Sequence, residues 1–431
     1  MGYTKELVKK LNSLSVFRKL KQDEVFHAFV ECVYHYAYVP EKKEEFHAKF
    51  CSALYEIGHT DNWTEYLKNK IVSLENPCTY FASRGQKIPK YIEKSARNDL
   101  EILAEIASVT PEMLLEDEHI ISYWDDLDIE HILMSDYPPD DAPDDIPKWR
   151  ADSVNYIAYT YFEWLAEIHK HGYGDYAIYH MFHMQLNNKN GFVLKPVKYP
   201  DNVQLQDLIG YELQRNQVIE NTKALLNGLK ASNILLYGDA GTGKSATVKA
   251  VANAFADEGL RLIELSKNEL HLLPKLLEEL SENPLKFILF IDDLSFQEND
   301  DDFSALKAVL EGSISARLHN TVIYATSNRR HIVRETFSQR DGDEIHRNDT
   351  IQETISLSER FGIQILYDKP NKNLYLEIVN KLAEQYGLEL DFKTLAIEAE
   401  RFALRKSGRS ARSARQLIEQ LYAKQKGGFS C

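Results

Sequence analysis

Hydrophobic positions along the chain separate a helical first part from a second part in which short strands alternate with helices. Over the first ~190 residues, apolar side chains recur with a period near 3.6, which is the period of an amphipathic α-helix. One such stripe runs from Phe26 to Ala37, and another runs from Val154 to Ile168. We therefore expect residues 1–195 to form an all-α N-terminal domain.

The pattern changes near residue 200 to short apolar runs separated by amphipathic stretches. Strand, helix and strand in succession indicate a parallel sheet with right-handed crossovers and helices on both faces. We assign residues 196–369 to an α/β domain of this kind. Its expected strands are Asn233–Tyr237, Arg261–Leu265, Phe287–Ile291, Thr321–Ala325 and Ile363–Leu366.

The strand pattern stops after Pro370, and three helical patterns follow it. They cover residues 372–386, 392–404 and 410–424. Asp391 and Ser410 stand where the N-cap residues of the second and third helices are expected. Residues 370–431 are therefore predicted to form a small helical lid domain.

One stretch between an expected strand and an expected helix has the spacing of a phosphate-binding loop. It matches G-x-x-x-x-G-K-[ST] at every fixed position. Glycines let successive backbone N–H groups surround phosphates, while the N-terminus of the next helix points at their charge. We expect Lys244 to bind the phosphates of ATP and the hydroxyl of Ser245 to bind Mg²⁺. The residues expected to contact the phosphates are Gly238, Asp239, Ala240, Gly241, Thr242, Gly243, Lys244, Ser245 and Ala246.

A second motif consists of an apolar strand that ends in two carboxylates. The strand Phe287–Ile291 is followed directly by Asp292 and Asp293. Because the carboxyl ends of parallel strands meet at one edge of a sheet, both carboxylates should lie beside the phosphate-binding loop. We expect Asp292 to hold Mg²⁺ and Asp293 to orient or activate the attacking water.

These motifs resemble the AAA+ class of P-loop ATPases over residues 200–424. The chain is most similar to a bacterial family of predicted ATPases with a helical N-terminal region, domain of unknown function 815. The stretches that carry this resemblance are Asp207–Glu212, Leu310–Ser313, Ala325–His331 and Ser358–Gly362.

The resemblance implies roles for residues outside the two motifs. Leu208, Ile209 and Gly210 would border the adenine. Asn328 would be the polar sensor that holds the attacking water or touches the γ-phosphate. Arg360 would be an arginine finger that reaches the γ-phosphate of a neighbouring subunit, since a planar guanidinium suits the spread charge of a phosphoryl transition state. A homo-oligomer follows from that role.

Two features of the resemblance leave questions open. The second sensor is best placed at Arg412 by spacing, while Arg409 and Arg415 remain alternatives. Asp293 stands where the class usually has the longer glutamate, so slow hydrolysis is expected.

Composition and charge restrict the cellular setting and the partners. The chain has 431 residues and a net charge of −15, and residues 101–150 alone carry 15 acidic and 2 basic side chains. No apolar run approaches the ~20 residues needed to cross a bilayer. The four cysteines form no C-x-x-C pair, so we expect a soluble, reduced, cytoplasmic protein without membrane contact.

The main hypothesis is an Mg²⁺-dependent AAA+ ATPase that couples its ATP/ADP cycle to conformational change or assembly on an unknown protein partner. A first rival is a nucleotide-gated binding module with little turnover. A second rival is a nucleic-acid remodeller or loader, suggested by the arginines between Arg401 and Arg415. The acidic charge disfavours nucleic acid, and charge segregation instead favours protein docking.

Overall fold

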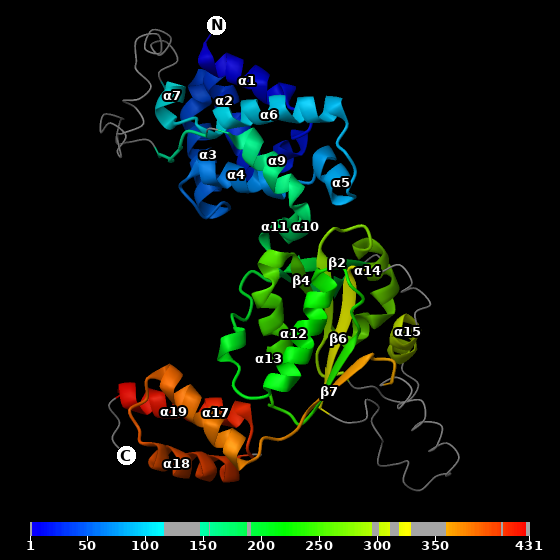
Figure 1. Cartoon of the computed structure of the whole chain (residues 1–431). Helices are drawn as coiled ribbons and strands as arrows, with labels where there is room; N and C mark the ends of the chain where they lie inside the picture. The colour runs from blue at the N-terminus through cyan, green and yellow to red at the C-terminus, as the bar shows by residue number, and fades with distance from the viewer. Residues whose placement is uncertain are drawn as a thin grey trace. The chain divides into compact units, whose positions relative to one another are not determined.

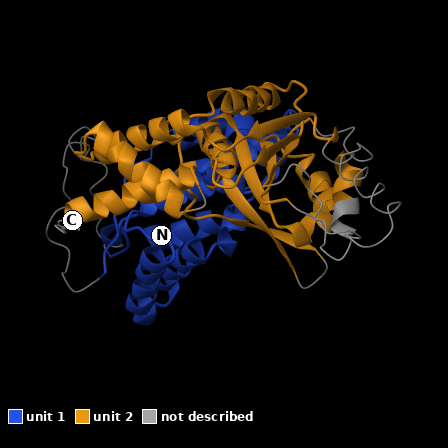
Figure 2. Cartoon of the chain, turned by 90° about the horizontal axis from the view of Figure 1, so that it is seen from below, with its two compact units in different colours: residues 1–178 blue, residues 179–431 orange. Residues whose placement is uncertain are grey.

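The structure is a computed structural model that describes residues 2–115, 147–154, 156–187, 191–294, 301–310, 319–328, 359–406 and 408–427. The chain divides into two compact units, residues 1–178 and 179–431, which Figure 2 shows in different colours. The Pro- and Asp-rich stretch 136–146 and most of the acidic segment, residues 116–146, lie outside the described residues.

The first unit is helical, as its apolar periodicity predicts (Figure 1). Its long helices carry one buried face each, and short helices connect them. The helices are α1 (Tyr3–Ser13), α2 (Glu24–Tyr38), α3 (Lys43–Glu56), α4 (Trp63–Ser73), α5 (Pro77–Ser83), α6 (Lys90–Ala107), α7 (Pro111–Leu115), α9 (Ile157–Ala166), α10 (Ile168–His171) and α11 (Asp175–Ile178).

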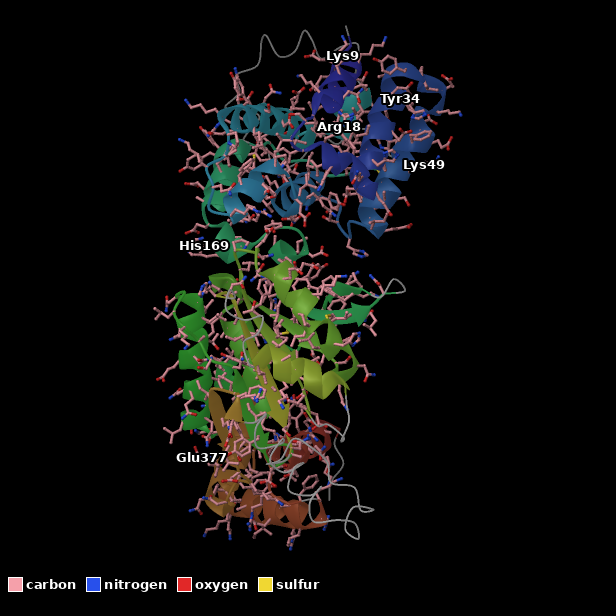
Figure 3. The ribbon with its side chains drawn as sticks, turned by 90° about the vertical axis from the view of Figure 1, so that its right-hand side faces the viewer. Lys9, Arg18, Tyr34, Lys49, His169 and Glu377 are labelled. Atoms are coloured by element: carbon pink, nitrogen blue, oxygen red, sulfur yellow. The ribbon has the colours of Figure 1, made fainter. Side chains whose placement is uncertain are left out.

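Aromatic side chains fill the centre of this unit. The rings of Phe29 and Trp63 stack at 4.6 Å, and Phe50 meets Trp63 edge-on at 5.2 Å and Trp149 at 4.8 Å. The carboxylate of Asp99 is buried with them and accepts three backbone N–H groups, from residues 15 to 17. Charged side chains such as Lys9 and Lys49 are exposed on the outside of the helices (Figure 3).

The second unit is built on a sheet of seven strands in the described residues, in the order β2-β1-β4-β5-β6-β3-β7. All neighbouring pairs are parallel except β1 with β2. Five strands match the predicted ones within one or two residues. The strands are β1 (Met181–Leu186), β2 (Phe192–Pro196), β3 (Ile234–Gly238), β4 (Leu260–Leu265), β5 (Lys286–Ile291), β6 (Thr321–Ser327) and β7 (Ile363–Tyr367).

The predicted helical assignment of residues 1–195 is wrong at its C-terminal end. Residues 181–196 form the hairpin of β1 and β2, and β1 pairs in parallel with β4. This pairing connects segments about 80 residues apart, so local periodicity does not reveal it. The second compact unit therefore begins at residue 179 and includes the hairpin.

Helices cover both faces of this sheet, as the alternation of strands and helices predicts. Figure 1 shows α12 and α13 on one side and α14 and α15 on the other. Apolar side chains of α12 and α13 share one core with alternate residues of β3 and β5, such as Ile234 and Ile288. The helices are α12 (Glu212–Leu226), α13 (Lys244–Ala254), α14 (Leu273–Leu280) and α15 (Asp301–Leu310).

A three-helix lid follows the last strand. Its helices are α17 (Lys372–Tyr386), α18 (Phe392–Arg405) and α19 (Ala411–Gly427), close to the predicted ranges. Asp391 caps α18 by accepting the backbone N–H groups of Lys393 and Thr394, and the Ser410 hydroxyl accepts the N–H of Ser413 at the start of α19. Across the described residues, no helix has both the length and the apolar character needed to cross a membrane.

Candidate functional site

A cavity of about 550 Å³ lies where the strand ends, the loop after β3 and the lid helices meet. The parallel pairing of β3, β5 and β6 brings their carboxyl ends to one edge of the sheet. The residues that the sequence singled out converge on this cavity, apart from Gly238, Asp239 and Arg360, which do not line it. Its volume is in the usual range for a small-ligand site.

The loop after β3 has the backbone that a phosphate cradle requires. Gly238 has φ +127°, and a Cβ there would lie 2.3 Å from the carbonyl oxygen of Tyr367, so a larger residue cannot occupy this position. Asp239 ties the loop to the end of β7. Its N–H donates to the Tyr367 carbonyl at 3.0 Å, and its carboxylate accepts the N–H of Lys369 at 3.0 Å.

Lys244 begins α13, and its ammonium points back into the loop. It donates to the carbonyl oxygens of Gly238 at 3.2 Å and Asp239 at 2.7 Å, and to Oδ1 of Asn328 at 3.0 Å. Burial lowers the pKa of Lys244, opposed by the nearby carboxylates of Asp239, Asp292 and Asp293. A buried ammonium held by neutral oxygens is well suited to receive an anionic ligand.

Asp292 follows β5 and accepts hydrogen bonds from two hydroxyl groups. Its Oδ1 accepts from Ser245 at 2.6 Å and from Thr326 at 2.5 Å. Carboxylate and hydroxyl oxygens are the hard ligands that Mg²⁺ prefers. The donor set at Ser245 and Asp292 therefore fits a magnesium ion.

Asp293 adopts a left-handed backbone with φ +52°, which is uncommon for a residue other than glycine. Its N–H donates to the Thr326 hydroxyl at 2.9 Å, and its carboxylate accepts from the amide of Asn328 at 2.8 Å. Since Asn328 also accepts from Lys244, one chain of hydrogen bonds links the phosphate loop to both aspartates. This arrangement keeps the Asp293 carboxylate at the cavity.

The far end of the cavity is apolar. Leu208, Ile209 and Gly210 line it together with Ile378 and Leu382 of α17. Ile209 also packs against the hydrophobic core of the lid. A flat aromatic group is the ligand that such walls accommodate best.

The lid supplies the arginines of the site. Arg412 and Arg415 line the cavity, and the N–H of Arg412 donates to the Gly241 carbonyl at 3.1 Å. Arg409 lies outside the lining and pairs with Glu400 at 2.7 Å. Arg360, three residues before the start of β7, is also outside the lining. Residues 329–358, between Asn328 and Glu359, lie outside the described part of the chain.

Several residues of the site had no role in the sequence prediction. Thr326 carries the hydrogen bonds that join the two aspartates, and Arg215 and Tyr211 also line the cavity. Thr326 lies within the Ala-Thr-Ser-Asn stretch and could have been chosen from its position before Asn328. Arg215 is a single arginine in an amphipathic helix, and it belongs to no sequence motif that would indicate a role in the site.

A parallel sheet with a phosphate loop after β3, paired carboxylates after β5, a polar residue after β6 and a helical lid defines an AAA+ P-loop nucleotide-binding fold. The chain belongs to the family described as Protein of unknown function (DUF815), which it matches over residues 178–425. The matched region coincides with the second compact unit.

Comparison with solved structures finds RuvB, the Holliday junction branch migration motor of Thermotoga maritima. The match has 16% sequence identity and a TM-score of 0.38, and covers 52% of this chain and 66% of the RuvB chain. Two single-residue variants of the same RuvB match with a TM-score of 0.37, 16% identity and the same coverage. The match thus spans slightly less than two thirds of the RuvB chain. No curated protein matches the chain.

Proposed function

We propose that this protein binds ATP with Mg²⁺ and hydrolyses it, and that the nucleotide cycle moves the lid against the α/β core. The observation that carries this proposal is the continuous hydrogen-bonded chain in one cavity, from Lys244 through Asn328 to Asp293, beside the Ser245–Asp292 pair. A packing role would not require an ammonium, two carboxylates and a hydroxyl to converge on a cavity of this size.

The residues around the cavity have distinct roles in the proposed reaction. The loop N–H groups and Lys244 hold the phosphates and offset their charge. Asp293 accepts a hydrogen bond from the attacking water and orients it, while Asn328 fixes the Asp293 carboxylate. Arg412 and Arg415 add positive charge from the lid side of the cavity. Their position makes the lid responsive to the phosphates.

Ser245 and Asp292 would hold Mg²⁺, which would neutralise the negative charge that develops on the phosphates. The two oxygens now share a short hydrogen bond of 2.6 Å. Both residues line the cavity, and the same Asp292 oxygen also accepts from the Thr326 hydroxyl of β6. An incoming ion would replace the hydrogen bond between Ser245 and Asp292.

Arg360 does not line the cavity of its own chain, which is compatible with a role toward a neighbouring copy. We therefore propose a homo-oligomer in which Arg360 completes the site of an adjacent subunit. The specific activity should then rise with protein concentration, whereas the activity of Arg360→Ala should stay low at all concentrations.

Steady-state ATP turnover with and without Mg²⁺ tests the proposal. Lys244→Ala and Asp292→Asn should each lower kcat/KM by about 100-fold or more. Lys249→Ala is the matched control, because Lys249 is on the same helix but pairs with Glu264 outside the cavity. Activity that persists in both site variants would refute the proposal.

A nucleotide-gated binding module is the second candidate, favoured by one observation. The Asp293 carboxylate is shorter than glutamate and is already engaged by Asn328. Under this alternative, ATP and ADP bind tightly, turnover stays negligible at any protein concentration, and a non-hydrolysable ATP analogue drives assembly. Sizing by light scattering with each nucleotide, in parallel with the turnover assay, separates the two functions.

A further inference from the structure

Arg215 occupies a position that packing does not explain. It is the fourth residue of α12, close to a helix N-terminus where a positive charge is disfavoured by the helix dipole. Its side chain is only 14% exposed. Withdrawing a guanidinium from water costs free energy unless its N–H groups have acceptors. The acceptors around Arg215 therefore indicate why it is there.

Two backbone carbonyls are those acceptors. Nη1 of Arg215 donates to the carbonyl oxygen of Leu208 and, at 2.6 Å, to that of Gly210. The nearest carboxylate is that of Glu212, which is 61% exposed and 3.5 Å away. The guanidinium thus spans the two residues on either side of Ile209 and fixes the loop between them.

The backbone of this loop has an unfavourable conformation at one residue. Gly210 and Tyr211 have consecutive left-handed backbones, with φ +77° and +58°, and such a backbone is unfavourable for tyrosine. The Tyr211 hydroxyl donates to the Asp368 carbonyl at 2.6 Å, and its ring stacks on Tyr367 at 5.1 Å. Arg215 and Tyr211 together hold this loop against its strain.

This arrangement leaves Ile209 as the residue whose backbone can bind a ligand. Within the described ranges, no hydrogen bond engages the N–H or the C=O of Ile209, and the residue lines the apolar end of the cavity. A donor and an acceptor from one residue match the edge of adenine, which offers N1 as acceptor and the 6-amino group as donor. Guanine presents the reverse pattern, N1–H as donor and O6 as acceptor.

We propose that Arg215 is a specificity-determining residue that makes the site select adenine over guanine. By occupying the Leu208 and Gly210 carbonyls, it removes two acceptors that could otherwise receive the N–H groups of guanine. By fixing the loop, it keeps the Ile209 N–H and C=O available to adenine. Sites that read a ligand through buried hydrogen bonds reject the mismatched ligand strongly. The inference rests on the proposed nucleotide binding. It assigns recognition of the base to the loop that Arg215 holds, whereas Lys244 and the phosphate loop bind the phosphates.

Calorimetric titration of the full chain with ATP, GTP and inorganic tripolyphosphate tests this role. Arg215→Gln should lower the affinity for ATP by about tenfold and change the affinity for GTP much less, so that the preference for ATP falls. Tripolyphosphate, which has no base, should bind within about twofold of the wild-type affinity. Lys223→Gln is the matched control, since Lys223 is exposed on the same helix.

Arg215→Lys provides a second variant if the glutamine variant does not fold. It keeps the charge but not the planar fork, so its preference for ATP should lie between those of wild type and Arg215→Gln. An unchanged ATP-to-GTP ratio in the folded variants would overturn the inference. A parallel loss of tripolyphosphate binding would also overturn it, because Arg215 would then only support the fold.

The wild-type titrations separate this inference from the function on which it rests. Equal affinity for ATP and GTP, with tripolyphosphate bound, would overturn the role of Arg215 and leave the phosphate site standing. A wild-type protein that binds neither ATP nor tripolyphosphate would instead refute nucleotide binding itself.

Discussion

Replacing Thr326 by valine isolates the hydroxyl that joins the two aspartates of the site. Thr326 is only 2% exposed, and valine has nearly the same shape, so the substitution removes the hydroxyl without leaving a large cavity. The hydroxyl donates to Asp292 at 2.5 Å and accepts the N–H of Asp293 at 2.9 Å. Valine removes both interactions at once.

The structure sets the size of the expected effect. The bond to Asp292 is charge-assisted and worth about 1.5–3 kcal/mol. The Asp293 N–H retains a second acceptor, Oδ1 of Asp292 at 3.2 Å, so its loss adds only about 1 kcal/mol. If the charge-assisted bond serves to position the carboxylates for reaction, kcat should fall by about 10- to 100-fold. ATP affinity should change much less, because Lys244 and the loop remain intact.

The assay is steady-state ATP turnover with separate kcat and KM, together with thermal unfolding of each variant. Thr222→Val is the matched control. Thr222 is also buried and its hydroxyl also makes two hydrogen bonds, to Val218 and Tyr324, but it does not line the cavity. The control should lose about 1–3 kcal/mol of stability and keep its kcat. Equal kcat losses in the two variants, or none in Thr326→Val, would refute a positioning role for Thr326.

Three further predictions concern the site and the helical unit. Asp293→Asn retains a side chain that tolerates the left-handed backbone but loses the base, so kcat should fall about 100-fold while equilibrium titration finds ATP still bound. Burial lowers the pKa of His47 below 6.5, although its bond to the Pro147 carbonyl opposes this shift. The unfolded chain therefore binds this proton more readily, and the stability of the first unit should decline as the pH falls below 6.5, less steeply in His47→Gln. Asp99→Ala should destabilise the same unit by about 2–4 kcal/mol, because the buried N–H groups of Val16 and Phe17 and the part-buried N–H of Ser15 lose their acceptor. Tryptophan fluorescence in urea titrations measures both stability effects, since all four tryptophans precede residue 179.

Local sequence signals predicted most of the second unit. Apolar runs located five of its strands, and the caps at Asp391 and Ser410 located the lid helices, because each feature is determined by neighbouring residues. The phosphate loop was predictable for the same reason. Gly238 is required by the close approach of Tyr367, yet the spacing of the loop glycines is visible in the sequence without that partner.

Features that depend on distant segments were not predictable. The strand β1 exists because it pairs with β4, and its own alternation is too short to distinguish it from the end of a helical region. Thr326 obtains its role from the carboxylate of Asp292, 34 residues earlier in the chain. The partners of Arg215 are close in sequence, but they lie in a loop whose conformation the sequence does not indicate. An isolated arginine or threonine is not part of a recognisable sequence motif, so its role becomes visible only in the structure.

The hydrogen bonds between Asp239 and the end of β7 have a mechanical consequence. Asp239 sits inside the phosphate loop, and its partners Tyr367 and Lys369 begin the connection to α17. Under the proposed function, these two bonds would transmit a displacement of the loop directly to the residues that precede α17. A small rotation at Lys369 would then move the far end of α17 more than its near end.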